Sequence, residues 1–130
     1  MSQENVEIIR ASLEAAQQGE AEAALSYYSE DVVWHNRPPE VGPYHGREGV
    51  VRAIAGFAEH FDDYWLEADR FVDAGDQVVL LWRQGGTGKS SGASIEEEGA
   101  TVFNLEDGSI YRVQVYSDRD EALEAARLSE

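Results

Sequence analysis

The second half of the chain carries a run of alternating apolar and polar residues that is interrupted by two tight-turn signals. The turns are Asp73-Ala74-Gly75-Asp76 and Glu106-Asp107-Gly108, and both combine aspartate with glycine, as hairpin turns do. Strands that follow one another through hairpins pair as an antiparallel sheet. The expected strands are residues 64–72, 77–84, 94–105 and 109–116, with a Gly/Ser-rich hairpin loop at 85–92.

Helical spacing replaces this alternation in the first half of the chain and at its end. Apolar residues recur there at intervals of three and four, which predicts amphipathic helices. Gly19 is placed to terminate the first helix, and Asp118 is placed to cap the last one. The expected helices are residues 2–18, 20–28, 47–61 and 118 onward, with a short strand at 32–35 and a proline-containing loop at 37–45.

This order of elements predicts an α+β fold. We expect a conical barrel of a curved antiparallel sheet with three to four helices enclosing a cavity, and residues 1–130 correspond by length to a single domain. Concave interiors of this kind are where small-molecule sites tend to form. The aromatic residues expected to contact a ligand there are Tyr28, Phe57, Phe61 and Trp82.

The charge balance restricts the possible partners. The chain has 26 Asp and Glu against 10 Lys and Arg, a net charge of −16 and a sequence pI of about 4.4. Clustered basic residues recognise nucleic acids and anionic membranes, so neither is an expected partner, whereas a small apolar or neutral molecule is permitted. The sequence has no apolar run of bilayer length, no signal-peptide pattern and no cysteine, so we expect a cytoplasmic protein.

The segment from Glu30 to Val50 holds the first candidate site residues. Its apolar strand ends in Trp34, His35 and Asn36 before the prolines begin. If the strand alternates, Trp34 and Asn36 share a face, where Trp34 would stack on an apolar ligand and Asn36 would hydrogen-bond to it. His35 would serve as a base only if the end of the strand twists inward. The alternative is that Trp34 is core, His35 is exposed and Asn36 forms a turn.

The later strands supply further polar candidates. Arg112, Gln114 and Tyr116 share one face by period two. They line the cavity if that face is concave, and they form a dimer interface if it is convex. Glu67 and Asp69 alternate with aromatic residues, and a carboxylate buried there would be an acid/base candidate.

No metal and no cofactor is expected. The three histidines, His35, His45 and His60, follow none of the spacings of a metal site. Residues 85–90 are similar to a phosphate-binding loop, but Arg83 stands where the first glycine is required, and strand sequence follows in place of a helix.

Three stretches of the chain carry a family resemblance. They are AQQGEAEAALSYYSEDVVW, YHGREGVVRAI and NLEDGSIYRVQVYSDRDEALEAARL. With them, nearly the whole chain resembles the SnoaL-like group of the nuclear-transport-factor-2-like superfamily. The resemblance implies a conical α+β barrel with a central cavity and a homodimer formed through the sheet. The superfamily includes steroid isomerases, polyketide cyclases, epoxide hydrolases, dehydratases and domains without chemistry, so the fold does not name a reaction.

The catalytic residues of the ketosteroid isomerases are replaced at the corresponding positions. Counted from Asp31, their general-base aspartate corresponds to Asn36; counted from Gly19, the helix tyrosine of their oxyanion hole corresponds to Ser12. Their protonated aspartate on a late strand corresponds to Ala100. An amide is no base at neutral pH and alanine donates no hydrogen bond, so this mechanism is not expected.

Two functions follow as expectations. The first is a SnoaL-like small-molecule-binding protein that acts as an acid/base isomerase, cyclase or hydrolase on an apolar substrate, with His35, Asn36 and Tyr116 as catalytic residues. The alternative is a non-catalytic dimeric ligand carrier or protein-interaction module. A carboxylate or histidine inside the cavity would favour the enzyme, and a lining of apolar groups and amides would favour binding.

Overall fold

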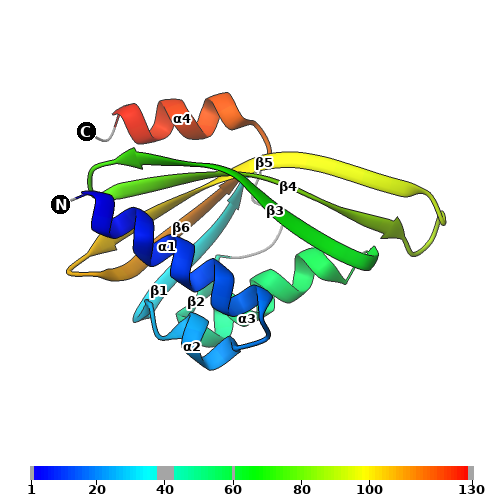
Figure 1. The fold of residues 1–130 in the computed structure, drawn as a ribbon, viewed down its shortest axis with the longest axis horizontal. Coiled ribbons are helices and arrows are strands. Elements are labelled where there is room, and N and C mark those ends of the chain that lie inside the picture. Colours follow the sequence, from blue (N-terminus) through cyan, green and yellow to red (C-terminus); the bar gives the residue numbers. More distant parts are fainter. Residues whose placement is uncertain (1, 38–42, 60, 129–130) are drawn as a thin grey trace.

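The chain folds as one curved sheet with helices on both of its faces (Figure 1). The computed structural model describes residues 2–37, 43–59 and 61–128. The α+β class, the curved sheet and the four helices confirm the prediction. The elements are α1 (Ser2–Gln17), α2 (Ala21–Leu25), β1 (Tyr28–Arg37), β2 (Tyr44–His45), α3 (Gly46–Ala58), β3 (Phe61–Ala74), β4 (Gln77–Gly88), β5 (Ser94–Glu106), β6 (Ser109–Tyr116) and α4 (Arg119–Leu128).

The last four strands form the expected antiparallel meander, and their turns follow the glycine positions. Asp107 and Gly108 have φ values of 51° and 78°, so both central residues of the β5–β6 turn are left-handed, as a type I′ hairpin requires. Gly75 has a φ of 76° in the β3–β4 turn. The sheet order is β2-β1-β6-β5-β4-β3.

The prediction of a purely antiparallel sheet is wrong at one pair of strands. β1 lies between β2 and β6, and it runs parallel to β6 with Trp34 opposite Val113. The alternation of residues identifies a strand but carries no information on its partner, so the sequence pattern did not reveal this pairing.

Four element boundaries differ from the expected ones. Phe61 begins β3 and does not extend the face of α3, because that helix ends at Ala58. Tyr28 begins β1 instead of ending the second helix. Tyr44 and His45 form β2 inside the expected loop. The β4–β5 hairpin stays paired as far as Thr87, so the first half of the expected loop at 85–92 belongs to β4.

The caps of the helices confirm the predicted ends. Gly19 has a φ of 78°, its N–H donates to the carbonyl of Ala16, and the N–H of Glu20 donates to Ala15, which is a Schellman motif. At α4 the side chain of Asp118 accepts the backbone N–H groups of Asp120 (2.8 Å) and Glu121 (3.2 Å).

Two apolar clusters lie on opposite faces of the sheet. Helices α1, α2 and α3 cover the concave face, and α4 covers part of the convex face (Figure 1). Because side chains alternate along a strand, Val113 and Val115 of β6 belong to the concave cluster and Tyr116 to the convex one. The convex cluster consists of Val79, Ala100, Val102, Tyr116, Ala122 and Ala126.

Candidate functional site

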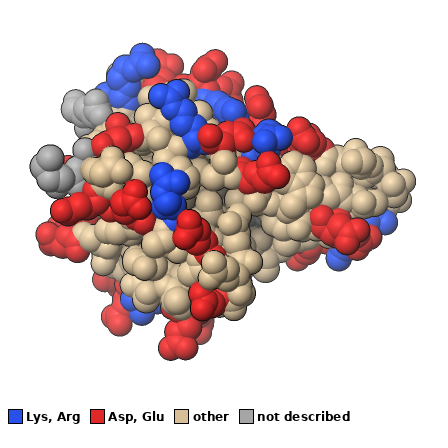
Figure 2. Space-filling view, in the orientation of Figure 1, with Lys and Arg blue, Asp and Glu red and all other residues tan. Residues whose placement is uncertain are grey.

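A cavity of about 760 Å³ lies between the concave face of the sheet and the first three helices. Small-molecule sites commonly have this size. All the described residues that line the cavity are uncharged. This lining contrasts with the outer surface, where acidic side chains far outnumber basic ones (Figure 2).

The tryptophans of the protein are concentrated at this cavity. The sequence contains three, and Trp34, Trp65 and Trp82 all line it. Glycines on β4 and β5 make room for two of the indole rings. A Cβ on Gly85 would lie 2.8 Å from Trp65, and a Cβ on Gly99 would lie 2.6 Å from Trp82. The rings therefore lie directly on the backbone and form flat walls.

One polar group of the cavity comes from α1 and the start of β1. The Ser12 hydroxyl donates to the carbonyl of Ala24 (3.2 Å), and the Tyr28 hydroxyl is hydrogen-bonded to Ser12. Burial raises the pKa of Tyr28 to about 12, and the Ser12 contact offsets only part of this effect. Tyr28 therefore stays protonated at neutral pH.

A second polar group comes from β3, β4 and β5. The Tyr64 hydroxyl donates to Oε1 of Gln84 (2.8 Å), and Nε1 of Trp82 donates to Oγ1 of Thr101 (2.9 Å). Burial, assisted by the charge of Glu97, raises the pKa of Tyr64 to about 12. These side chains carry no charge and can form hydrogen bonds with a ligand.

The structure brings three of the predicted ligand-binding residues together. Trp34, Tyr28 and Trp82 line the cavity. Phe61 does not; it lies at a shallow depression beside the tip of the β4–β5 hairpin and packs against Tyr64, with 5.8 Å between ring centroids. The side chain of Phe57 lies outside the described part of the chain.

The predicted catalytic residues are not among those that line the cavity. Asn36 shares the face of Trp34, and its Oδ1 accepts the Trp34 indole N–H (3.1 Å). His35 points to the opposite face, beside Arg112 and His45. Partial burial, together with these two neighbours, lowers the pKa of His35. Tyr116 is buried beneath α4.

Arg112 and Gln114 also lie on the convex face. Their neighbours Val113 and Val115 belong to the concave cluster. Of the two alternatives for Arg112 and Gln114, the structure therefore has the convex one. A homodimer through this face and a cytoplasmic location stay predictions.

The positions matched to the isomerases separate in the structure. Ser12 lines the cavity, whereas Ala100 is buried under α4, and its neighbour Thr101 faces the cavity. The one-residue difference matters because adjacent residues of a strand point to opposite faces.

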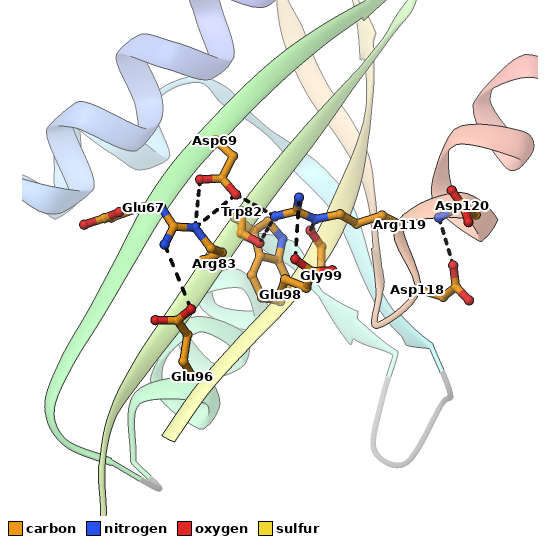
Figure 3. A network of polar contacts seen from close by, with 10 residues as sticks. All are labelled: Glu67, Asp69, Trp82, Arg83, Glu96, Glu98, Gly99, Asp118, Arg119 and Asp120. Atoms are coloured by element: carbon orange, nitrogen blue, oxygen red, sulfur yellow. Dashed lines mark hydrogen bonds and ion pairs between the residues drawn. The ribbon is translucent and has the colours of Figure 1, made fainter. Parts of the chain in front are cut away.

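Asp69 and Glu67 belong to an ionic network on the outside of the sheet (Figure 3). Arg119 donates to Asp69 (2.8 Å) and to the backbone carbonyls of Trp82 (2.7 Å) and Gly99 (3.2 Å). Hydrogen bonds from Arg119 and Arg83 lower the pKa of Asp69. Neither carboxylate is a buried acid/base group, and the network fastens the start of α4 to β3, β4 and β5.

Five polar residues of the lining were not identified as site residues by their pattern: Ser12, Gln17, Tyr64, Gln84 and Thr101. A signal for two of them exists. Gln84 continues the alternation of Leu80 and Trp82 along β4, so it had to share their face. Thr101 shares a face with Phe103 for the same reason.

Metal and membrane features are absent from the described parts of the chain. Within residues 2–37, 43–59 and 61–128, no three His, Asp or Glu side chains gather closely enough to hold a metal ion. None of the helices in these ranges has the length and apolar character needed to cross a membrane.

The match to a family profile and the similarity to solved structures agree with one another. The profile of the SnoaL-like domain matches residues 9–113. Among solved structures, an NTF2-like protein from Burkholderia thailandensis has a TM-score of 0.78 at 24% identity, with 97% of each chain covered. A putative SnoaL-like polyketide cyclase from Jannaschia sp. CCS1 has a TM-score of 0.76 at 20% identity, covering 95% of this chain and 91% of that one.

A third solved structure holds a ligand. It is TerC co-crystallised with polyporic acid, with a TM-score of 0.73 at 21% identity, covering 95% of this chain and 98% of that one. No curated protein matches the chain. At these identities the solved structures show a shared fold.

Proposed function

Because this chain belongs to the SnoaL-like domain family, we propose that its cavity binds a small, uncharged and largely apolar molecule with a flat ring system. The observation that carries the proposal is the lining itself. It combines three indole rings with uncharged hydrogen-bonding groups in a space of about 760 Å³. Such a site favours ligands that bury apolar area and need few, well-placed hydrogen bonds.

The apolar surface is sufficient for useful affinity. Burial of apolar area contributes roughly 25 cal/mol per Å², so a ligand that buries about 300 Å² gains about 7.5 kcal/mol before the costs of association. An ionised ligand would lose its hydration with no opposite charge among the described lining residues. The site therefore selects against charged molecules.

The same lining favours binding over acid/base catalysis. A general base must reach the proton that it removes, and His35 and Asn36 are not among the residues that line the cavity. Tyr28 and Tyr64, with pKa values of about 12, stay protonated at neutral pH and serve as hydrogen-bonding groups. We therefore propose a ligand-binding protein in preference to an isomerase, cyclase or hydrolase.

The tryptophans make this proposal directly testable. Because all three line the cavity, intrinsic fluorescence reports on its occupancy. We would titrate the protein with steroids, aromatic polyketides and terpene epoxides, and follow fluorescence and melting temperature together. A ligand at 100 times its dissociation constant adds about 2.7 kcal/mol of stability, which is a shift of several degrees.

A pair of variants locates the site. Trp82→Phe removes an indole wall and its bond to Thr101, so the affinity of a binding compound should fall. Tyr111→Phe changes an exposed side chain outside the lining and should leave the affinity unchanged. If the affinity of a compound is the same for the wild type and for Trp82→Phe, the ligand binds elsewhere. If no neutral compound produces either signal, the proposal is refuted.

A further inference from the structure

The side chain of Gln84 presents an unused pair of N–H donors in the wall of the cavity. Gln84 is only 6% exposed and it lines the cavity. Its Oε1 accepts the Tyr64 hydroxyl, and its amide nitrogen makes no hydrogen bond with the described residues. Among the residues that the structure describes, the sealed-off polar side-chain atoms without a partner are Gln77 Oε1 and Asn104 Oδ1. Since Nε2 of Gln84 is not one of them, this nitrogen is not sealed off, and the residue that carries it lines the cavity.

The orientation of this amide is fixed by Tyr64. The Tyr64 hydroxyl donates its proton to the carbonyl end of the amide (2.8 Å), whereas a turned amide could only donate to the phenol oxygen and would leave the Tyr64 proton without this acceptor. Tyr64 follows Asp63, which has a φ of 53° and lies where the pairing of β3 with β4 shifts. This bulge re-aims the strand, as bulges do, and the residues from Tyr64 to Leu66 all line the cavity.

The surroundings of the amide are apolar and flat. Trp82 lies two residues earlier on the same face of β4, and Trp65 lies over the backbone of Gly85. A hydrogen bond made between such rings is stronger than one made in water, and a buried donor without a partner is costly. Gln84 thus favours a ligand that brings an acceptor to this position.

The nearby charge indicates which acceptor fits. Glu97 pairs with Gln84 across β4 and β5, and its carboxylate acts electrostatically on Tyr64. This negative charge, in a chain with a net charge of −16, opposes a carboxylate or phosphate at the same place. An uncharged carbonyl oxygen accepts the hydrogen bond without that repulsion.

We propose that Gln84 selects ligands that carry an uncharged carbonyl acceptor on a flat ring system, and that Tyr64 is the positioning residue that holds the amide in the donating orientation. This inference rests on the proposed function, because it specifies the ligand class of the same cavity. It assigns the specificity of the site to β4, whereas the sequence pattern had placed it at the end of β1.

The test compares two ligands that differ only in the carbonyl group. Fluorenone and fluorene are flat tricyclic molecules of nearly equal size, and their dissociation constants are measured by equilibrium dialysis. The wild type should bind fluorenone about 3- to 10-fold more tightly, the range expected for one net hydrogen bond. Gln84→Met, which keeps the length of the side chain and removes the donors, should abolish this preference and leave fluorene binding in place.

Two further variants separate specificity from folding. Tyr64→Phe should reduce the preference, because the amide is then free to turn its oxygen toward the ligand. Gln114→Met makes the same chemical change as Gln84→Met on the convex face and should leave the preference unchanged. Far-UV circular dichroism checks that each variant is folded. If one variant does not fold, the ratio of the fluorene and fluorenone dissociation constants of the wild type still tests the proposed preference.

The possible failures are distinct. Equal binding of fluorenone and fluorene by the wild type, or a preference that survives Gln84→Met, overturns the role of Gln84 while the cavity remains a binding site. If neither compound binds, and the wider panel of neutral molecules gives no signal either, the proposed function is overturned together with this inference.

Discussion

The burial of the Tyr28 hydroxyl predicts a loss of stability at alkaline pH, and Tyr28→Phe should remove the part of this loss that comes from Tyr28. Tyr28 is 7% exposed, and its pKa is raised from 10.0 to about 12. In the unfolded chain the phenol would ionise near pH 10, whereas in the folded protein it keeps its proton for about two further pH units. The folded state therefore binds more protons than the unfolded state in this interval, so stability falls as pH rises.

The size of the effect follows from this shift. The contribution of Tyr28 is fully present below pH 10 and is lost as pH rises through 12. One pKa unit corresponds to about 1.36 kcal/mol. Between pH 8 and pH 11 the wild type should lose about 1.4 kcal/mol through this residue, and the loss should approach about 2.7 kcal/mol above pH 12.

Urea unfolding at pH 8 and pH 11 measures the effect for the wild type and two variants. Tyr28→Phe costs about 1 kcal/mol at pH 8, because the hydrogen bond to Ser12 is lost. Its further loss up to pH 11 should be about 1.4 kcal/mol smaller than that of the wild type. Tyr111→Phe, at a side chain that is 40% exposed, should follow the wild type. If Tyr28→Phe loses as much stability with pH as the wild type, the burial of this phenol does not control alkaline stability.

Three further substitutions test the packing around the sheet. Gly99→Ala would place a Cβ 2.6 Å from Trp82 and should cost about 1–3 kcal/mol by thermal unfolding, whereas Gly56→Ala, with open space around it, should be neutral or stabilising. Arg119→Ala leaves the backbone carbonyls of Trp82 and Gly99 without the Arg119 donor and should cost about 1–3 kcal/mol in urea unfolding. A change in the free energy of unfolding below a few tenths of a kcal/mol would show that these hydrogen bonds do not stabilise the protein. Asp118→Ala removes the cap of α4 and should cost about 1 kcal/mol, and an unchanged melting temperature would contradict the capping role.

The fold was predictable where local chemistry decides the structure. The left-handed glycines, the aspartate cap of α4 and the two Asp/Gly turns mark element ends by mechanisms that act over a few residues. The parallel pairing of β1 with β6 joins segments far apart in the chain, and no local pattern encodes it. The boundary at Phe61 was misplaced because its spacing also fits a helix that in fact ends at Ala58.

The site was only partly predictable, because period two groups residues without saying which group faces inward. Arg112 and Gln114 were correctly placed on one face, and the alternating Val113 and Val115 are the more apolar set, so they belong against the helices. That comparison was available in the sequence. The role of Gln84 was not, since its free amide depends on a bond from another strand.

The place of β1 in the sheet has a consequence for the folding of the chain. β1 spans residues 28–37, and its partner β6 spans residues 109–116, so the two can pair only after a long loop has closed. Loop closure of this kind slows folding, whereas the hairpins from β3 to β6 need only neighbouring residues. We expect the meander to form first. The apolar side of β1, with Val32 and Trp34, then stays open to other chains until the last strand arrives, which makes the first third of the protein its most aggregation-prone part during folding.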